Sequence, residues 1–443
     1  MGEWRRVKIG DLCQIIKGET GLASALPGEY PLVATGAERR SCATWQFDTE
    51  AVCIPLVSST GHGKKTLNYV HYQSGKFALG TILAAVIPKD PSVLTARFLH
   101  LYLSHFKDTV LVPLMKGAAN VSLPMKAIAS VEIPVPPMEA QQNLMDLICR
   151  IEDEHGALLS ETNRQGDFLK QLRQAVLQEA VEGKLTAAWR KQHPVVKDDP
   201  QCDAVALLAQ IKAEKERLVK EGKIRKEKPL PPIADDDKPF DLPDGWVWCR
   251  LGEVFDVCGG IQKTPSRKPV LNYYPYLGVQ NVQRGYLALD NVENFEATIS
   301  EFERLRLQNG DLLVIEGNGS LKEIGRCAIW QEQLTYCIHQ NHIIRLRPIL
   351  VEPEYILKMM NSPTGIEQMQ EKAKTTTGLY NLSAGKVKTV ILTLPPLAEQ
   401  QAIVARADSL MAVIDNLEKQ VAERKEQAQL LMQTVLREAF DGN

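Results

Sequence analysis

The sequence predicts a mixed α/β (α+β) protein with a pseudo-two-fold internal repeat, in which two similar globular domains are separated by two long antiparallel helices that form a coiled coil. The prediction depends on two alignments of the chain with itself. Residues 174–183 align with residues 433–442 without a gap, and the same register places residues 136–142 on residues 395–401. Residues 4–18 align with residues 246–260, each stretch beginning with tryptophan and ending with glycine. Matching ends around divergent middles indicate two similar frames that hold different surfaces.

The alignments divide the chain into five segments. Residues 1–135 form the first globular domain, 136–185 the first spacer helix, 186–245 a charged, proline-rich linker with a short helix, 246–394 the second globular domain, and 395–443 the second spacer helix. The linker is assigned by composition, because a basic run at 223–228 is followed by a proline-rich stop at 229–232. Sequence of this kind connects domains. The basic run either contacts a phosphate backbone or remains a solvated part of the linker.

The two spacer helices have matching start and stop signals. Each follows a proline pair and carries an acidic residue in its first turn, Glu139 in one copy and Glu399 in the other. Proline at a helix start and negative charge near the helix N-terminus both favour initiation there. Gly183 and Gly442 are expected to end the helices.

Apolar residues in both helices recur at alternating steps of four and three, which is the pattern of a heptad seam. The seam positions are Leu144, Ile148, Ile151, Leu158, Leu169, Leu172 and Val176 in the first helix, and Ile403, Leu410, Ile414, Leu417, Val421, Leu431 and Val435 in the second. A helix over residues 138–181 would be about 65 Å long. It would be too long to bury its row of apolar side chains inside one small domain. We therefore expect the two helices to pack on each other, antiparallel, with the globular domains at opposite ends. The alternative is that each helix packs on its own domain or on a partner subunit.

Three polar residues, His155, Thr162 and Gln165, fall on the seam of the first helix. Polar groups at such positions either fix the register of a coiled coil or form a stripe that awaits a partner. Both interpretations stay open at this stage.

Composition excludes several classes of protein. The 443 residues are 44% hydrophobic, and no run of about 18 apolar residues is present to span a bilayer, so we expect a cytoplasmic protein. The 52 basic and 54 acidic residues nearly balance, which argues against a chain that grips a long nucleic-acid tract by itself. The nine cysteines form no C-x-x-C pair, so they predict free thiols and no zinc site.

The common catalytic motifs are absent from the sequence. An adenine methyltransferase needs a glycine-rich cofactor turn and an Asn/Asp-Pro-Pro-aromatic turn, and an ATPase needs G-x-x-x-x-G-K-[ST]; neither pattern occurs. No metal-ligand cluster is evident either. The sequence therefore points to recognition, with no metal and no cofactor held by this chain.

Polar loops between apolar runs supply the candidate DNA contacts. Arg, Lys, Asn and Gln can read base edges in the major groove, while Ser and Thr hold phosphates. The candidates are Arg39, Arg40, Ser59, His62, Lys64 and Lys65 in the first domain, and Arg267, Lys268, Gln280, Asn281, Arg284, Asn318, Ser320, Lys322 and Lys374 in the second. Each loop taken singly is also compatible with an ordinary exposed loop.

Together these features resemble the specificity subunit of type I restriction-modification systems. The resemblance is carried by the Trp-to-Gly openings at 4–18 and 246–260, by the Pro-Pro-hydrophobic starts at 136–138 and 395–397 with their Gln-Gln pairs, and by residues 175–186. Residues 311–314 followed by 318–321 also look like a stretch found in target-recognition domains of that family. The segment that follows Gly183 has no repeat after residue 442, which puts symmetric partner contacts there in doubt.

The resemblance implies that each globular domain is a target-recognition domain and that the chain reads an asymmetric, bipartite target in double-stranded DNA. It implies two modification (adenine methyltransferase) subunits that bring S-adenosylmethionine, and restriction subunits that add ATP-driven, Mg-dependent translocation and cleavage. The chain itself would be non-catalytic. The helical spacer would set the unread gap between the two halves of the target.

Two other classes of function stay open. The chain could be a non-catalytic scaffold whose coiled coil matters and whose globular ends bind protein, or its repeat could be a purely structural duplication. It could also be an enzyme, such as a nuclease, with an unrecognised site. Co-purification with a methyltransferase favours DNA recognition, whereas turnover of DNA by the isolated chain favours an enzyme.

Overall fold

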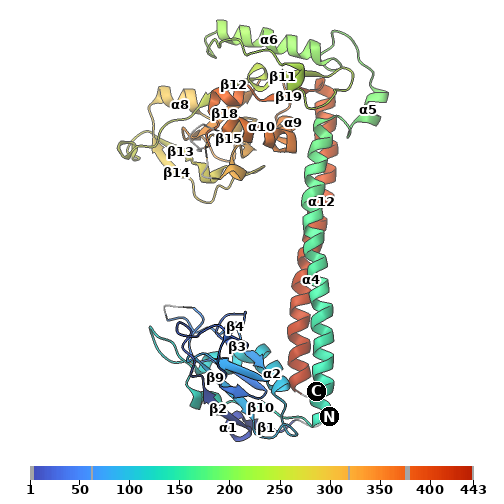
Figure 1. Cartoon of the computed structure of the whole chain (residues 1–443). Helices are drawn as coiled ribbons and strands as arrows, with labels where there is room; N and C mark the ends of the chain where they lie inside the picture. The colour runs from blue at the N-terminus through green and yellow to red at the C-terminus, as the bar shows by residue number, and fades with distance from the viewer. Residues whose placement is uncertain (1–3, 61–62, 318–319, 375–379, 442–443) are drawn as a thin grey trace. The chain divides into compact units, whose positions relative to one another are not determined.

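The computed structural model describes residues 4–60, 63–317, 320–374 and 380–441, apart from the side chains of Lys322 and Asp441. The chain divides into two compact units. Unit 1 comprises Met1–Arg164 and Val421–Asn443, and unit 2 comprises Gln165–Gln420. Each unit contains one mixed domain together with a part of both long helices (Figure 1).

Unit 1 contains two four-stranded sheets. The first has the order β2-β9-β6-β7 and is antiparallel; the second has the order β4-β3-β8-β5, with β3 and β8 parallel. A short ribbon, β1-β10, joins the two ends of the domain. The bounds are β1 (Arg6–Lys8), α1 (Ile9–Leu12), β2 (Cys13–Lys17), β3 (Tyr30–Val33), β4 (Arg40–Cys42), β5 (Phe47–Asp48), β6 (Ala51–Pro55), β7 (His71–Gln73), β8 (Lys76–Leu79), β9 (Leu83–Pro88), α2 (Ala96–Val110), η1 (Val112–Leu114), α3 (Met125–Ala129) and β10 (Glu132–Pro134).

The domain of unit 2 repeats this topology. Its antiparallel sheet has the order β12-β18-β15-β16, its second sheet the order β14-β13-β17 with β13 and β17 parallel, and its closing ribbon is β11-β19. The bounds are β11 (Val247–Arg250), α7 (Leu251–Val254), β12 (Phe255–Gly259), η3 (Pro265–Arg267), β13 (Tyr273–Leu277), η4 (Val279–Asn281), β14 (Glu293–Glu296), α8 (Ile299–Leu305), β15 (Leu312–Ile315), η5 (Leu321–Glu323), β16 (Cys327–Ile329), β17 (Ile338–His339), β18 (Ile343–Pro348), α9 (Pro353–Asn361), α10 (Pro363–Ala373), α11 (Ala384–Lys388) and β19 (Ile391–Leu394). The predicted internal repeat is therefore confirmed at the level of strand order.

The glycine that ends each matching opening has a physical role. A Cβ at Gly18 would lie 2.2 Å from the carbonyl oxygen of Gly80, and a Cβ at Gly260 would lie 2.2 Å from that of Gln340. Both glycines precede an isolated parallel bridge at which the chain passes from the first sheet to the second. Only glycine allows the two backbones to approach so closely, which explains why both copies keep it.

The glutamine pairs also have a structural role. Gln141 is fully buried, and its amide donates to the carbonyl of Val93 and accepts from the backbone N–H of Thr95. Gln400, at the matching position, donates to the carbonyl of Pro395 and accepts from the N–H of Glu352. Each glutamine thus binds the start of a long helix to the segment that precedes the main helix of its domain.

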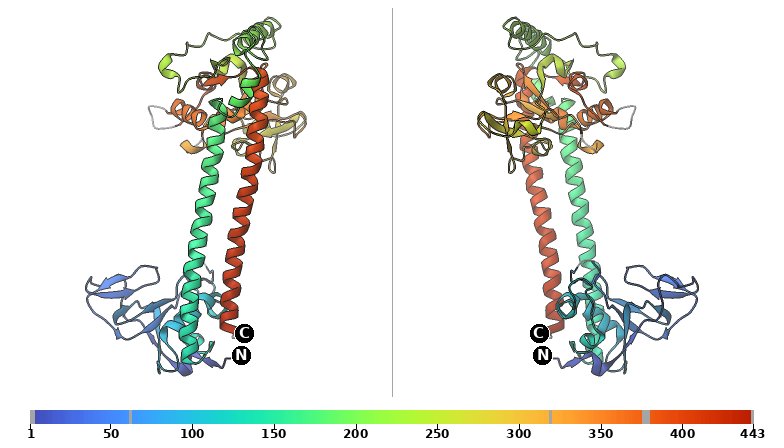
Figure 2. Two further views of the ribbon diagram at one scale, coloured as in Figure 1. Left: turned by 90° about the vertical axis from the view of Figure 1, so that its right-hand side faces the viewer. Right: turned by 90° about the vertical axis from the view of Figure 1, so that its left-hand side faces the viewer.

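The long helices are α4 (Met138–Val181) and α12 (Leu397–Asp441), and they run side by side and antiparallel within each unit (Figures 1 and 2). In unit 1, Ile148 of α4 shares the domain core with Leu436 and Phe440 of α12. In unit 2, Ala180 of α4 shares the core with Ile403 of α12. Gly183, with φ of 73°, stands just after the end of α4 as predicted, and Gly442 lies outside the described residues.

The predicted seam is correct at most positions and wrong at four. The residues that are buried or half-buried are Leu144, Ile148, Ile151, Leu169, Val176, Ile403, Leu410, Ile414, Val421 and Val435. By contrast Leu158 and Leu172 are each 46% exposed, Leu417 is 39% exposed and Leu431 is 63% exposed. At each of these four places the following residue, Leu159, Arg173, Glu418 or Met432, is the more buried one. The inward-facing residue is one step later at these four places only, so the helices depart locally from a strict 3.5-residue repeat, as 3.6 residues per turn allows.

Polar contacts replace apolar ones where the seam moves. In unit 2, Arg173 of α4 donates to Asp415 at 2.5 Å and to Glu418 at 2.9 Å on α12. In unit 1, Lys425 of α12 donates to Asn163 of α4 at 3.0 Å. Thr162, which is buried, donates its hydroxyl to the carbonyl three residues earlier in its own helix. Polar pairs between the helices favour one register, because a shift would leave them unpaired.

The linker packs on the domain of unit 2. Its helices are α5 (Ala187–Gln192), α6 (Ala204–Lys220) and the short η2 (Asp235–Asp237). Leu207 and Ile211 of α6 are buried in the same core as Val254 and Phe255, and Figure 1 shows α6 lying over β11 and β12. The segment that composition identifies as a connector is therefore a structural layer of the domain.

A buried carboxylate anchors the first part of the linker. Glu399, 1% exposed in the first turn of α12, accepts from Trp246 Nε1 at 2.7 Å, from Thr186 Oγ1 at 2.7 Å and from Arg190 at 2.5 Å. The first-turn N–H groups of Leu397 and Ala398 donate to carbonyls of residues 200 and 201 in the linker. The acidic residue that the sequence predicts as a helix initiator therefore also holds the linker in place.

Candidate nucleic-acid interface

Most of the predicted DNA contacts lie in loops that occupy equivalent places in the two domains. The loop between β6 and β7, residues 56–70, corresponds to the loop between β15 and β16, residues 316–326. The loop between β3 and β4, residues 34–39, corresponds to the loop between β13 and β14, residues 278–292. The two frames are alike, and the loops that they present differ in length and sequence.

In the first domain, hydroxyl groups hold the loop of residues 56–70 in shape. Ser58 Oγ donates to the carbonyl of Lys64 at 2.6 Å, and the hydroxyls of Thr60 and Thr66 bond at 2.8 Å. Ser59 Oγ accepts from the backbone N–H of residue 68 at 2.9 Å, so its side chain is already used inside the loop. Lys64 and Lys65 are exposed. The candidate His62 lies outside the described residues.

The two adjacent arginines of the first domain have different environments. Arg39 donates to Gln73 Oε1 at 2.9 Å and to the carbonyl of Tyr72 at 3.1 Å, and it lies 3.2 Å from His71 Nδ1. Partial burial lowers the pKa of Arg39. Arg40 is exposed, in the first position of β4. Arg40 is thus available to a ligand, whereas Arg39 already joins its loop to β7.

In the second domain, Asn281 is a structural residue. It is 2% exposed; its amide donates to the carbonyls of Ala288 and Asn291, and its oxygen accepts from the N–H of Gly278. Every polar atom of the side chain is therefore engaged in shaping the loop of residues 278–292. Because both amide hydrogens are donated inside the loop and the side chain is buried, Asn281 shapes the loop, and its contact with DNA stays a prediction.

Two arginines of the second domain are also bound within it. Arg267 forms a bidentate pair with Glu301, with N···O distances of 2.8 and 2.9 Å, and this pair holds the pKa of Glu301 at about 2. Arg284 donates to Asn361 at 3.3 Å, and burial lowers its pKa. A bidentate pair between a guanidinium and a carboxylate fixes the positions of both side chains. The pair between Arg267 and Glu301 therefore stabilises the segment that precedes β13.

The remaining candidates of the second domain are exposed. Lys268 and Ser320 lie in loops, Gln280 lies in η4, and Lys374 follows the end of α10. The residue Asn318 and the side chain of Lys322 lie outside the described part of the chain. The structure therefore separates the predicted set into residues that face solvent and residues that hold the loops in position.

Sequence reasoning missed three exposed tyrosines, two in loops and one at the start of a strand. Tyr69 lies in the loop before β7, Tyr273 begins β13, and Tyr286 lies in the loop before β14; all three are exposed. A tyrosine hydroxyl can bond a phosphate, and its ring can contact a sugar or a base. The signal was present in the sequence, as aromatic residues inside otherwise polar stretches.

The structure shows no grouping of three or more His, Cys, Asp or Glu residues suited to a metal ion in the part of the chain that it describes. All nine cysteines are described and carry free thiols. Burial raises the pKa of Cys53 and of Cys327 to about 12, so these two thiols stay protonated at neutral pH. Across the described residues, no helix is both long and apolar enough to cross a bilayer.

Comparisons with known proteins agree with the repeat. A family model described as "Type I restriction modification DNA specificity domain" matches residues 1–163 and 243–426. The chain is 26% identical over 351 residues to the type I restriction enzyme EcoKI specificity subunit of Escherichia coli strain K12, covering 77% of this chain and 65% of that protein. It is 31% identical over 276 residues to the EcoEI specificity subunit of Escherichia coli, covering 60% of this chain and 44% of that protein. The matches thus span less than two thirds of the length of either relative.

Two solved structures share the fold. A chain from a study titled "Structural basis underlying complex assembly and conformational transition of the type I R-M system" is 17% identical, with a TM-score of 0.60, 99% of this chain covered and 98% of that chain covered. The HsdS subunit from Thermoanaerobacter tengcongensis is 17% identical, with a TM-score of 0.54, 100% of this chain covered and 97% of that chain covered. Because the family model matches both copies of the repeat, this chain belongs to the type I restriction modification DNA specificity domain family.

Proposed function

We propose that this chain is the sequence-reading subunit of a type I restriction-modification complex and that it binds an asymmetric, bipartite target in double-stranded DNA. Membership of the family supports a role in DNA specificity. The observation that carries the proposal is the repeat itself, in which two frames of the same strand order present different loops. Two unlike readers imply two unlike halves of the target.

The loops have the properties of a reading surface. Their described parts are held by bonds inside each domain, such as the bond between the hydroxyls of Thr60 and Thr66 and the Arg267–Glu301 pair. Cations project from them into solvent, for example Lys64 in the first domain and Lys268 in the second. A surface ordered before binding loses less conformational entropy on association. Fixed loops with free cations therefore suit recognition of one duplex geometry.

Catalysis is assigned to partner subunits. Modification subunits, two in number, would bring S-adenosylmethionine and transfer the methyl group to adenine, and restriction subunits would supply ATP- and Mg-dependent translocation and cleavage. This chain would choose the sequence and perform no chemistry. Its nearly balanced charge, with 52 basic and 54 acidic residues, supports a division of labour in which partners provide much of the phosphate contact.

Methylation sequencing tests the proposal. The chain is co-expressed with its modification subunit, and genomic adenine methylation is mapped with and without it. We expect one bipartite motif that depends on the chain. Substitutions Lys64→Ala and Lys65→Ala should relax only one half of the motif, and Lys268→Ala with Gln280→Ala only the other. Methylation that is independent of the chain would contradict a reading role, and methyl transfer or cleavage by the purified chain alone would show that it is an enzyme.

A further inference from the structure

The linker returns from α6 along the second domain as an extended strap, residues 222–233, which is held at two points. Arg250, 6% exposed, donates to the carbonyl of Pro231 at 2.6 Å and to that of Pro232 at 2.9 Å. Lys388 of α11 pairs with Glu227 at 2.7 Å. Because a buried guanidinium must keep its acceptors, the strap is a fixed part of unit 2.

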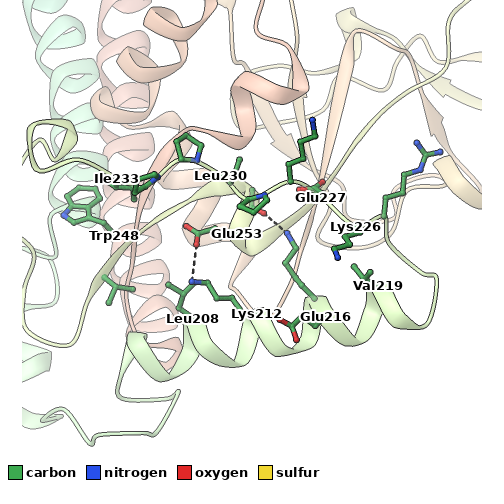
Figure 3. A pocket seen from close by; sticks show the side chains of 18 of the residues that line it. Leu208, Lys212, Glu216, Val219, Lys226, Glu227, Leu230, Ile233, Trp248 and Glu253 are labelled. Carbon is green, nitrogen blue, oxygen red and sulfur yellow. Dashed lines mark hydrogen bonds and ion pairs between the residues drawn. The ribbon is translucent and has the colours of Figure 1, made fainter.

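The strap separates two cavities. The first, of about 1100 Å³, lies between α6 and the strap. Figure 3 shows the side chains that line this first cavity: Leu208 and Lys212 of α6 face Leu230 and Ile233 of the strap. The second, of about 930 Å³, lies on the other side, between residues 222–228 and the residues of β12, β18 and α8. We call the second cavity the strap cleft.

The strap cleft has an excess of positive charge. Eight Lys or Arg residues and three acidic residues line it. Each of the three acids already has a basic partner: Glu227 pairs with Lys388, Asp256 with Arg345, and Glu303 with Arg306. The acids of the cleft are therefore neutralised by groups other than the cations of the strap.

Four cations of the cleft have no carboxylate partner among the described residues: Arg225, Lys226, Lys228 and Arg304. All four are exposed. Three of them lie within four consecutive residues of the strap, where the chain forms no regular helix or strand. In a chain whose total charge is −2, such a row of unpaired cations on an ordered backbone is a local exception.

We propose that the strap cleft binds the phosphate backbone of the DNA that flanks the half-target read by the second domain. A phosphodiester chain carries a regular series of negative charges, so it can bond several of these cations at once, which a single small anion cannot do. Arginine offers a fork to phosphate oxygens and lysine a point charge. The inference rests on the proposed function, because it assumes that the second domain docks on a duplex.

The consequence is a division of contacts within one unit. The loops of the second domain read bases, and the strap adds affinity that does not depend on sequence. Each phosphate contact releases counterions, so that log K falls with log salt by a slope of about 0.9 per contact. Removing two contacts should reduce the slope by about 1.8.

The test uses the complete complex with its modification subunits and a duplex carrying the motif found by methylation sequencing. Lys226→Gln with Lys228→Gln is compared with wild type from 50 to 200 mM salt. Because the slope falls by about 1.8, the affinity advantage of wild type should shrink about 12-fold over this fourfold change. The methylated motif should not change. Lys191→Gln with Lys197→Gln removes two exposed lysines from the same linker, and this control should behave as wild type.

A second arm trims the duplex outside the half-target of the second domain, which should abolish the difference between wild type and the strap variant. An unchanged salt slope, or a difference that survives trimming, would overturn the inference. A strap variant that no longer assembles with the modification subunits would instead identify the cleft as a site for an acidic protein segment. Failure of the proposed function is distinguishable, because wild type would then show no sequence-selective binding.

Discussion

Replacing Glu399 tests how the linker is attached. The carboxylate is 1% exposed and accepts from the indole of Trp246, the hydroxyl of Thr186 and the guanidinium of Arg190. In Glu399→Ala the indole N–H and the hydroxyl lose their acceptor in a buried site. Arg190, whose side chain is 21% exposed, loses its carboxylate.

The expected cost follows from these three groups. A buried donor left without an acceptor costs about 1–3 kcal/mol, and breaking a buried ion pair by removing one partner costs about 3–5 kcal/mol. The terms overlap, because relaxation and water entry serve all three groups, so we expect about 3–5 kcal/mol in total. For a unit of this size that corresponds to a fall in melting temperature of about 10 °C.

Thermal unfolding followed by tryptophan fluorescence measures the effect, and limited proteolysis over residues 184–203 shows whether the linker has been released. Glu139→Ala is the matched control, because Glu139 is an exposed acid in the first turn of α4. Its loss should cost only the interaction with the helix dipole, about 0.3–1 kcal/mol. Equal destabilisation by the two substitutions, with the linker equally protected, would refute the reasoning.

Four other predictions follow from the fold. Gly260→Ala should destabilise unit 2 by about 1–3 kcal/mol, because the new Cβ would lie 2.2 Å from a carbonyl oxygen. The control Gly259→Ala, whose Cβ has no atom within 4 Å, should cost less than about 0.5 kcal/mol. Urea unfolding measures both. Leu169→Ala should cost about 2–3 kcal/mol and Leu172→Ala less than about 1 kcal/mol; equal costs in chemical denaturation would restore the strict heptad register, in which both side chains are buried. Glu301→Gln should lower stability at pH 7, and the difference from wild type should disappear as the pH falls from 4.5 to about 2. The reason is that a carboxylate with a lowered pKa stabilises the fold only while it is ionised. Unfolding of both proteins over that pH range measures the difference. Adding one heptad to each long helix, about 10 Å, should lengthen the unread gap of the methylated motif by about three base pairs, and an unchanged motif would remove the idea that the helices set the gap.

The sequence predicted the repeat and the long helices because their signals are local or periodic. The proline pair lies just before the 44 residues of α4, and Gly183 lies just after them. Gly18 and Gly260 mark places where two backbone segments approach too closely for any residue with a Cβ. The seam was predicted only in part, because a helix with 3.6 residues per turn departs locally from a strict 3.5-residue repeat. That error is visible at Leu172, where the neighbouring Arg173 takes the inward position.

The candidate site was predicted only as a set of loops. Sequence identified polar loops between strands, and the structure places most of them at equivalent positions of the two domains. It could not separate residues that face solvent from residues that hold the loops. Arg39 and Arg40 are adjacent and chemically identical, and only the fold gives the first of them an acceptor, Gln73 Oε1, from a strand 34 residues away.

The duplicated frame and its two long helices could be predicted from the sequence, because start signals, stop signals and the apolar period act over one or a few helical turns. Which polar side chains remain available to a ligand depends on tertiary contacts. Arg267 is neutralised by Glu301, 34 residues along the chain, and Asn281 is enclosed by its own loop. Whether a polar group is free depends on hydrogen-bond partners that only folding brings within about 3 Å. Such partners can lie far apart in the sequence, so a local sequence pattern does not predict them.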